Sequence, residues 1–309
     1  MSVRIPRLIL SPPTFVQFSD IPEIAVIMSA SASPKDIYTA FVEAINARDW
    51  PAAQAVLAPT FTANDVETTP EALTQQIAGL SAAGPDLTST IDFMLPSSCG
   101  TKAFSRIIHR FTLAQDALGV KATGKPVEFA EASFFWVKDG KVYKNFTIID
   151  MAALAKGEGV DYKIASSMTA ANPAPEGFDL LAAYRSYVEL VQQGPTVENL
   201  SKFCHENLNV NNKDIKLEEY VGNIEEAKAT IEGMHWDLVE TVVDEQKQQI
   251  AARVVLTGKP VKDFAGIAPT GNSVRFPEHV LYQFDGAKIK QVVQLMDFNA
   301  YRSTLQTNA

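Results

Sequence analysis

Four carboxylates recur at matching positions in the two halves of this 309-residue chain. Asp150 and Glu131 correspond to Asp297 and Glu278, because 297 − 150 and 278 − 131 both give 147. Each Glu alternates with apolar residues along a predicted strand, and a period of two places such a set on one face of a sheet. Burial on an apolar face raises the pKa of a carboxyl group, which suits it to proton transfer near neutral pH. We therefore predict general acid/base candidates, the aspartates before the glutamates, at Asp297, Asp150, Glu278 and Glu131.

Possible hydrogen-bond donors to a substrate are divided unevenly between the halves. The second half has Tyr187 where the first has Phe41, and Tyr282 where the first has Phe135. Tyr and Asn can donate to a developing oxyanion, whereas Phe cannot. Such donors and one indole form the candidate substrate-binding set: Tyr184, Tyr187, Asn211, Tyr282, Tyr38, Asn64 and Trp236. We expect the second half to be the more active one, with Asp297 as its acid/base group.

No other chemistry is indicated by a motif. The four histidines, His109 among them, show no metal-ligand spacing such as HExxH, so we predict no metal site. The sequence also lacks the GxxxxGK[ST] and GxGxxG phosphate loops and a nucleophile elbow. We therefore predict no cofactor and no covalent catalysis.

The elements that would position these residues also repeat. Each half ends in a hairpin signal, an Asp-Gly pair between alternating apolar runs, at 139–140 and at 285–286. Ser33 followed by Pro34 marks the first helix, since Pro is favoured at the first helical position. Three helices and then a four-strand meander are predicted in each half, with strands near 87–95, 103–114, 126–138, 141–150, 236–246, 249–258, 273–284 and 287–297.

Three further local predictions concern shorter segments. Residues 61–66 are predicted as a loop or short strand, and residues 196–204 as the second helix of the second half. Ile231 is assigned to the third helix of that half.

These patterns divide the chain into four parts. Residues 1–33 form a loosely held extension and residues 34–156 a first domain. Residues 157–175 are rich in Ala, Gly, Ser and Pro, which is typical of a linker, and residues 176–309 form a second domain.

Bulk composition limits the classes of partner. With 46% hydrophobic and 20% charged residues, the chain is typical of soluble globular proteins, and no apolar run approaches the ~20 residues of a membrane span. The net charge of −9 argues against nucleic acid and anionic membranes as partners. Two widely separated cysteines, Cys99 and Cys204, fit a reducing compartment, so we expect a cytoplasmic protein.

A longer motif indicates a family. The run from Leu256 through Pro269-Thr-Gly to Asp297 resembles that of the SnoaL-like polyketide cyclase family, part of the nuclear transport factor 2-like superfamily. The first half keeps Thr123-Gly-Lys-Pro-Val, an Asp-Gly-Lys-Val segment and the final Asp. The resemblance implies an α+β protein with two tandem cone-shaped α+β barrel domains. Each would have three helices packed on a curved, mostly antiparallel sheet.

The resemblance also implies roles for residues. An Asp near the end of the last long strand is the general acid/base group of SnoaL-like cyclases, which implies this role for Asp150 and Asp297. The family's Thr-His is Leu256-Thr257 here, which is a departure from its pattern. Dehydratases of the superfamily use strand histidines, so His109 is a further acid/base candidate.

Structural alternatives remain open for each carboxylate. Asp150 and Asp297 could instead be caps or ion-pair partners at strand ends. The outer sheet face often joins two such domains, so Glu131 and Glu278 could lie at that contact. Packing of this kind within one chain would give an internal pseudo-dimer, and we predict a monomer in solution.

The predicted function is cofactor-independent general acid/base chemistry by a cyclase, isomerase or dehydratase. Its substrate would be a small apolar metabolite of polyketide or terpenoid type. The alternatives are a non-catalytic small-molecule binder and a protein-interaction module on the same fold. A pocket with a desolvated carboxylate favours the enzyme, a dry apolar pocket favours the binder, and a filled cone favours the interaction module.

Overall fold

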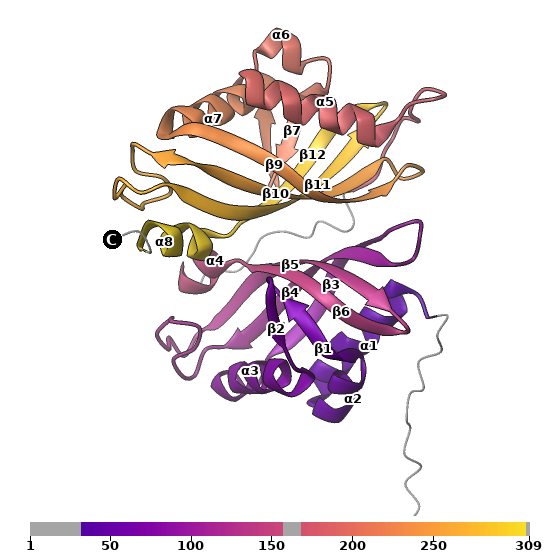
Figure 1. Cartoon of the computed structure of the whole chain (residues 1–309), viewed down its shortest axis with the longest axis vertical. Helices are drawn as coiled ribbons and strands as arrows, with labels where there is room; N and C mark the ends of the chain where they lie inside the picture. The colour runs from indigo at the N-terminus through magenta and orange to yellow at the C-terminus, as the bar shows by residue number, and fades with distance from the viewer. Residues whose placement is uncertain (1–31, 157–167, 307–309) are drawn as a thin grey trace, which may run out of the picture.

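Two domains face each other across their sheets, with most of their helices on the two far sides (Figure 1). The structure, a computed structural model, describes residues 32–156 and 168–306. Nearly all of the predicted extension and the first part of the predicted linker therefore lie outside the described residues. No helix in these two ranges is long and apolar enough to cross a membrane.

The first domain contains one six-stranded sheet in the order β2-β1-β6-β5-β4-β3. Neighbouring strands are antiparallel except for the parallel pair β1–β6. Its elements are α1 (Pro34–Ala47), α2 (Trp50–Ala55), β1 (Leu57–Ala63), β2 (Val66–Thr68), α3 (Pro70–Ala83), β3 (Thr88–Pro96), β4 (Lys102–Thr112), β5 (Pro126–Lys138), β6 (Lys141–Ile149) and α4 (Met151–Lys156).

The second domain repeats this topology, with the strand order β8-β7-β12-β11-β10-β9. Both sheets are open, and the predicted α+β fold in two tandem copies is confirmed. Its elements are α5 (Leu180–Gln193), α6 (Val197–Leu200), β7 (Cys204–Val210), β8 (Lys213–Lys216), α7 (Leu217–Thr230), β9 (Ile231–Asp244), β10 (Gln249–Pro260), β11 (Val274–Asp285), β12 (Lys288–Met296) and α8 (Phe298–Gln306).

Local signals account for many boundaries. Ser33 caps α1 through its side chain, and Asp36 reaches back to the Ser33 backbone, which completes a capping box. The β5–β6 hairpin turns at Asp139 and Gly140, whose φ angles of 51° and 71° are those of a two-residue turn matched to strand twist. These contacts lie between near neighbours in the chain, so the sequence pattern could predict them.

Other predictions were wrong or incomplete, because they depend on pairing between strands that are distant in the sequence. Each sheet has six strands rather than four, because β1 and β7 pair in parallel with β6 and β12, and β2 and β8 pair with β1 and β7 at the sheet edge. The predicted helix at 196–204 is wrong beyond Leu200, since Cys204 opens β7, and Ile231 opens β9 instead of ending a helix. The sequence pattern did not predict α4 and α8, which follow the last strand of each domain.

The two outer sheet faces meet in an apolar cluster. Phe104, Phe134 and Phe146 of the first domain pack there with Val242 and Leu281 of the second. Met168, from the predicted linker, joins the same cluster. The predicted packing of one domain on the other through their sheets is therefore present within the chain.

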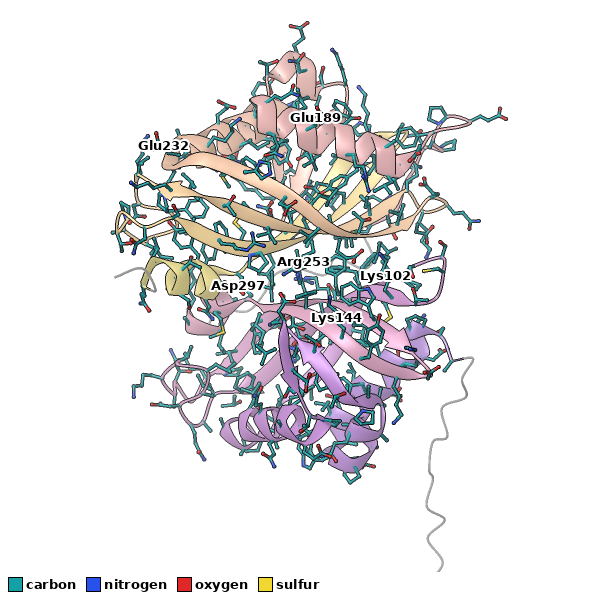
Figure 2. The ribbon with its side chains drawn as sticks, viewed as in Figure 1. Lys102, Lys144, Glu189, Glu232, Arg253 and Asp297 are labelled. Atoms are coloured by element: carbon teal, nitrogen blue, oxygen red, sulfur yellow. The ribbon has the colours of Figure 1, made fainter. Side chains whose placement is uncertain are left out.

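Polar groups supplement this contact. His279 Nδ1 lies 2.9 Å from the backbone oxygen of Ala132, its counterpart at the 147-residue offset. Contact between counterparts is expected where a pseudo-two-fold axis crosses an interface. Lys102 pairs with Glu240, and the Arg253 guanidinium lies 3.8 Å from the ring centre of Phe146 (Figure 2). The monomeric state stays a prediction.

Candidate functional site

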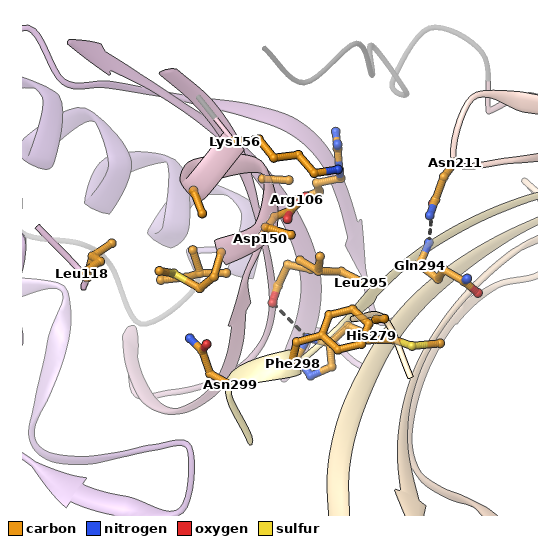
Figure 3. Close-up of a pocket in the computed structure, with 18 of the residues that line it drawn as sticks. Arg106, Leu118, Asp150, Lys156, Asn211, His279, Gln294, Leu295, Phe298 and Asn299 are labelled. Carbon is orange, nitrogen blue, oxygen red and sulfur yellow. Dashed lines mark hydrogen bonds between the residues drawn. The ribbon is translucent and has the colours of Figure 1, made fainter. Parts of the chain in front are cut away.

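Each domain has a cavity between its helices and the inner face of its sheet. The domain-one cavity has a volume of about 290 Å³ and the domain-two cavity about 130 Å³. A third space of about 820 Å³, the interdomain cavity, lies between the domains (Figure 3). Glu131 lines the first cavity and Glu278 the second, so the alternative that placed them at the domain contact is wrong.

A chain of three polar side chains lies in the domain-one cavity. His109 Nε2 on β4 is 3.3 Å from Glu131 Oε2 on β5, and His109 Nδ1 is 2.9 Å from Ser89 Oγ on β3. The strand register explains the first contact, because Glu131 pairs with Ile107 and is thus a diagonal neighbour of His109 on the same face. Three adjacent strands therefore bring together a hydroxyl, an imidazole and a carboxylate.

Glu131 is held in its charged form. Ser133 Oγ donates to Glu131 Oε1 over 2.9 Å, and the Tyr38 hydroxyl donates to the same oxygen over 3.4 Å. Desolvation by burial raises the pKa of Glu131, but hydrogen bonding and charge attraction from His109, with the bonds from Ser133 and Tyr38, bring it below its usual value. Burial and the nearby Glu131 charge raise the pKa of Tyr38, so its hydroxyl stays a hydrogen-bond donor.

The rest of the domain-one cavity is largely apolar. The His109 ring stacks on Phe129 with 4.9 Å between ring centres, which fixes its orientation. Asn64 lines the cavity but exchanges two hydrogen bonds with the Thr147 backbone, at 2.8 and 3.1 Å. We conclude that Asn64 positions the strand end and has limited freedom to bind a substrate.

Glu278 lies in the domain-two cavity without a partner. Its side chain is only 6% exposed, and no hydrogen bond or ion pair joins it to another described residue. Desolvation by burial raises the pKa of Glu278 to about 7. It is therefore a proton donor at slightly acid pH and a base above neutrality.

Four tyrosines line the domain-two cavity around Glu278. Tyr184, Tyr187 and Tyr282 were candidates from the sequence, as was Trp236, which also lines this cavity. Tyr220 was missed as a site residue, because its place on a helical apolar face suggested only a core role. The Tyr187 and Tyr220 hydroxyls lie 2.6 Å apart.

Asn211 is not part of this cavity. It lies in the β7–β8 turn with a φ of 48°, and its side-chain oxygen accepts from the Gln294 backbone at 2.9 Å (Figure 3). Its predicted substrate-binding role in the domain-two cavity is therefore not supported by its position.

Asp150 and Asp297 both cap helices. Asp150 Oδ1 accepts from the Ala153 backbone at 2.9 Å, at the start of α4. Asp297 Oδ1 accepts from the backbones of Asn299 and Ala300 at 3.0 and 2.9 Å, at the start of α8. Asp150 faces the interdomain cavity (Figure 3), and neither aspartate lines the cavity of its own domain. Their predicted acid/base role is not supported by these positions, whereas the alternative of a cap is what the structure shows.

The described residues do not form a metal-ligand cluster. Within residues 32–156 and 168–306, no three His, Cys, Asp or Glu side chains gather closely enough to hold a metal ion. His109 and Glu131 supply one pair of possible ligands, and Ser89 completes a hydrogen-bonded chain more suited to proton transfer.

Comparison with known proteins gives one family. The model of the SnoaL-like polyketide cyclase family matches residues 35–157 and again residues 181–303. No curated protein matches the chain.

Three solved structures are similar to parts of the chain. A SnoaL-like polyketide cyclase from Agrobacterium tumefaciens is 26% identical, with 41% of this chain and 98% of that chain covered and a TM-score of 0.39. IdmH from Streptomyces antibioticus is 22% identical, with 41% and 98% covered and a TM-score of 0.38. TsrD from Streptomyces laurentii is 21% identical, with 42% and 94% covered and a TM-score of 0.37.

Proposed function

Since the chain belongs to the SnoaL-like polyketide cyclase family, we propose that it is a cofactor-independent cyclase, isomerase or dehydratase for a small apolar metabolite of polyketide or terpenoid type. We place its acid/base site in the domain-one cavity. The observation that carries this proposal is the pairing of His109 with a charged Glu131 inside an apolar cavity.

The hydrogen bonds indicate which His109 nitrogen carries the proton. An ionised carboxylate only accepts, so the His109 nitrogen facing Glu131 carries the proton, and Nδ1 keeps a lone pair toward Ser89. Ser89 Oγ takes a proton from a carbon next to a substrate carbonyl and passes its own proton to Nδ1. The products of this step are an enolate and an imidazolium, and the Glu131 charge stabilises the imidazolium.

One first step serves all three reaction types. The enolate carbon can attack a second carbonyl in a cyclase, be protonated elsewhere in an isomerase, or expel a β-hydroxyl group in a dehydratase. In each case the imidazolium returns its proton at the end of the reaction. A dry apolar cavity would favour the non-catalytic binder, but here donors converge on a charged carboxylate.

A base-sensitive probe tests the site without knowledge of the substrate. Base removes the ring C–H proton of 5-nitrobenzisoxazole, and the isoxazole ring then opens to give a coloured phenolate. We expect the full-length protein to accelerate this reaction and His109→Gln to lower the rate ~100-fold, the usual scale of general-base loss. Gln keeps a donor toward Glu131, so thermal unfolding of the variant should resemble that of the wild type.

Asp297→Asn is the matched control. Asn caps helices about as well as Asp, so α8 should persist and the rate should stay at the wild-type value. The expectation drawn from the sequence predicts the opposite, a ~100-fold loss in Asp297→Asn. A folded His109→Gln variant with the wild-type rate would overturn the domain-one proposal.

A further inference from the structure

We propose that the domain-two cavity is a second, separate ligand site, which binds the carbonyl or enol oxygen of a compact neutral molecule through the Glu278 carboxyl and tyrosine hydroxyls. This inference goes beyond the acid/base site proposed for the first domain. It rests on three properties of the cavity, namely an isolated acid, a surplus of donors and a small volume.

The first property is the isolation of the acid. The titratable side chains that line the cavity with Glu278 are tyrosines, from α5 (Tyr184 and Tyr187), α7 (Tyr220) and its own strand β11 (Tyr282). Cys204 of β7 lies close to Tyr187 and Tyr220. Burial raises the pKa of the cysteine and of all four tyrosines, which therefore stay neutral. No described cation lines the cavity, so the neutral carboxylic acid is the favoured form at slightly acid pH.

The second property is a surplus of hydrogen-bond donors. The buried Tyr184 hydroxyl interacts with Tyr282 but forms no hydrogen bond of normal geometry with a described residue. The Tyr187 and Tyr220 hydroxyls bond to each other, which uses one of their two protons. The neutral Glu278 carboxyl adds another O–H. A ligand oxygen with two lone pairs can accept from this set, whereas an ammonium ion would bring further donors.

The third property is size. The volume of about 130 Å³ is close to that of a dry cavity known to admit benzene, about 150 Å³. The apolar wall includes Val188, Val191, Ile224 and Met296. A single six-membered ring that bears one carbonyl or enol oxygen fits both the volume and the polarity.

Cyclohexanone labelled with ¹³C at its carbonyl is a suitable probe, because it does not titrate near neutral pH. The chain has three tryptophans, and of these only Trp236 lines the domain-two cavity. Titration of the full-length protein should therefore move the Trp236 indole N–H signal saturably, along with the ligand carbonyl signal. This readout is independent of whether the first domain is catalytic.

The affinity should follow the protonation of Glu278. We expect a constant affinity below about pH 7, the pKa of Glu278, and a fall of up to tenfold per pH unit above it. Glu278→Gln keeps a donor at every pH, so its affinity should not depend on pH. Tyr184→Phe should weaken binding about 2- to 12-fold, the equivalent of one hydrogen bond. The exposed Tyr143 gives a matched control, and Tyr143→Phe should bind as the wild type does.

Three outcomes would overturn the proposal. The first is the absence of a saturable Trp236 shift, or a wild-type affinity that does not change with pH. The second is tight binding of benzylamine that strengthens above pH 7 while cyclohexanone does not bind, since Glu278 would then act as a countercharge. Retained binding in both Glu278→Gln and Tyr184→Phe, with no change in either affinity or pH dependence, would also contradict it.

Discussion

Glu131 and Glu278 hold the same position in two copies of one fold, yet their chemistry differs. The pKa of Glu131 lies below its usual value, while burial raises that of Glu278 to about 7. Both lie on the long strand that follows the largest hairpin loop, β5 or β11, and both line the cavity of their domain. The backbone therefore does not cause the difference.

The difference comes from the side chains that surround each glutamate. At the 147-residue offset, Leu256 stands where the first domain has His109, and Val280 stands where it has Ser133. Both replacements remove a hydrogen-bonding group and leave an apolar one. Three polar side chains offset the cost of burying a charge at Glu131, and the same carboxylate without them favours its neutral form.

The largest expected effect on stability comes from replacing each glutamate, Glu278 and Glu131, by glutamine. The unfolded Glu ionises near pH 4.5 and folded Glu278 near 7, so the wild type loses stability as pH rises through this window and carries the full penalty above it. The Glu278→Gln variant has no such loss of stability with rising pH. Relative to the wild type, its free energy of unfolding should rise by about 3 kcal/mol between pH 4 and pH 8.

Glu131→Gln should show the opposite sign. Its lowered folded pKa contributes stability that is present above the unfolded pKa and is lost as pH falls through the folded pKa. The variant should be about 1–3 kcal/mol less stable than the wild type at pH 8, and the gap should narrow in acid. Urea unfolding across this pH range measures both effects, and equal signs would refute the contrast between the domains.

His279, whose counterpart is Ala132, gives the next largest effect. Burial lowers its pKa to about 3, against 6.5 for the free side chain. Its stabilising contribution is therefore complete above pH 6.5 and is lost as pH falls toward 3, by up to about 1.4 kcal/mol per pH unit. His279→Asn keeps a donor for the Ala132 oxygen. Between pH 7.5 and pH 5 its free energy of unfolding should fall by about 2 kcal/mol less than that of the wild type. Equal acid sensitivity of the two proteins in chemical unfolding would count against this.

Val280→Ser would make the two glutamates more alike. It restores the hydroxyl that Ser133 offers to Glu131, on the strand that carries Glu278. A new hydrogen bond to the ionised form should lower the pKa of Glu278 by about 1 unit. The carboxyl ¹³C signal of Glu278 in an NMR titration measures this shift, and an unchanged or higher pKa would show that the hydroxyl does not reach it.

The aspartates give the smallest effect and should behave alike. Asp150→Ala and Asp297→Ala each remove a cap and should cost about 1 kcal/mol, whereas either Asn variant should cost much less. Thermal unfolding compares the four variants. A large loss in only one domain would show that one aspartate has a role beyond capping.

The sequence by itself determined the tandem repeat, the hairpins and the family. Turn residues, alternating apolar residues and a fixed repeat offset can be recognised in the sequence without knowledge of tertiary contacts. The same signals placed Glu131, Glu278 and three of the four cavity tyrosines among the candidates, and the family resemblance added His109.

Only the tertiary structure decided which candidates act together. Asp150 and Asp297 have the same place in the family motif as an acid/base group, but here the helices that follow them, α4 and α8, take their carboxylates as caps. Ser89 joins His109 through the β3–β4 pairing, and the partners of Glu131 come from three elements, α1, β4 and β5 itself. A pKa depends on neighbours that are distant in sequence, so two identical residues in one repeat could not be distinguished until those neighbours were known.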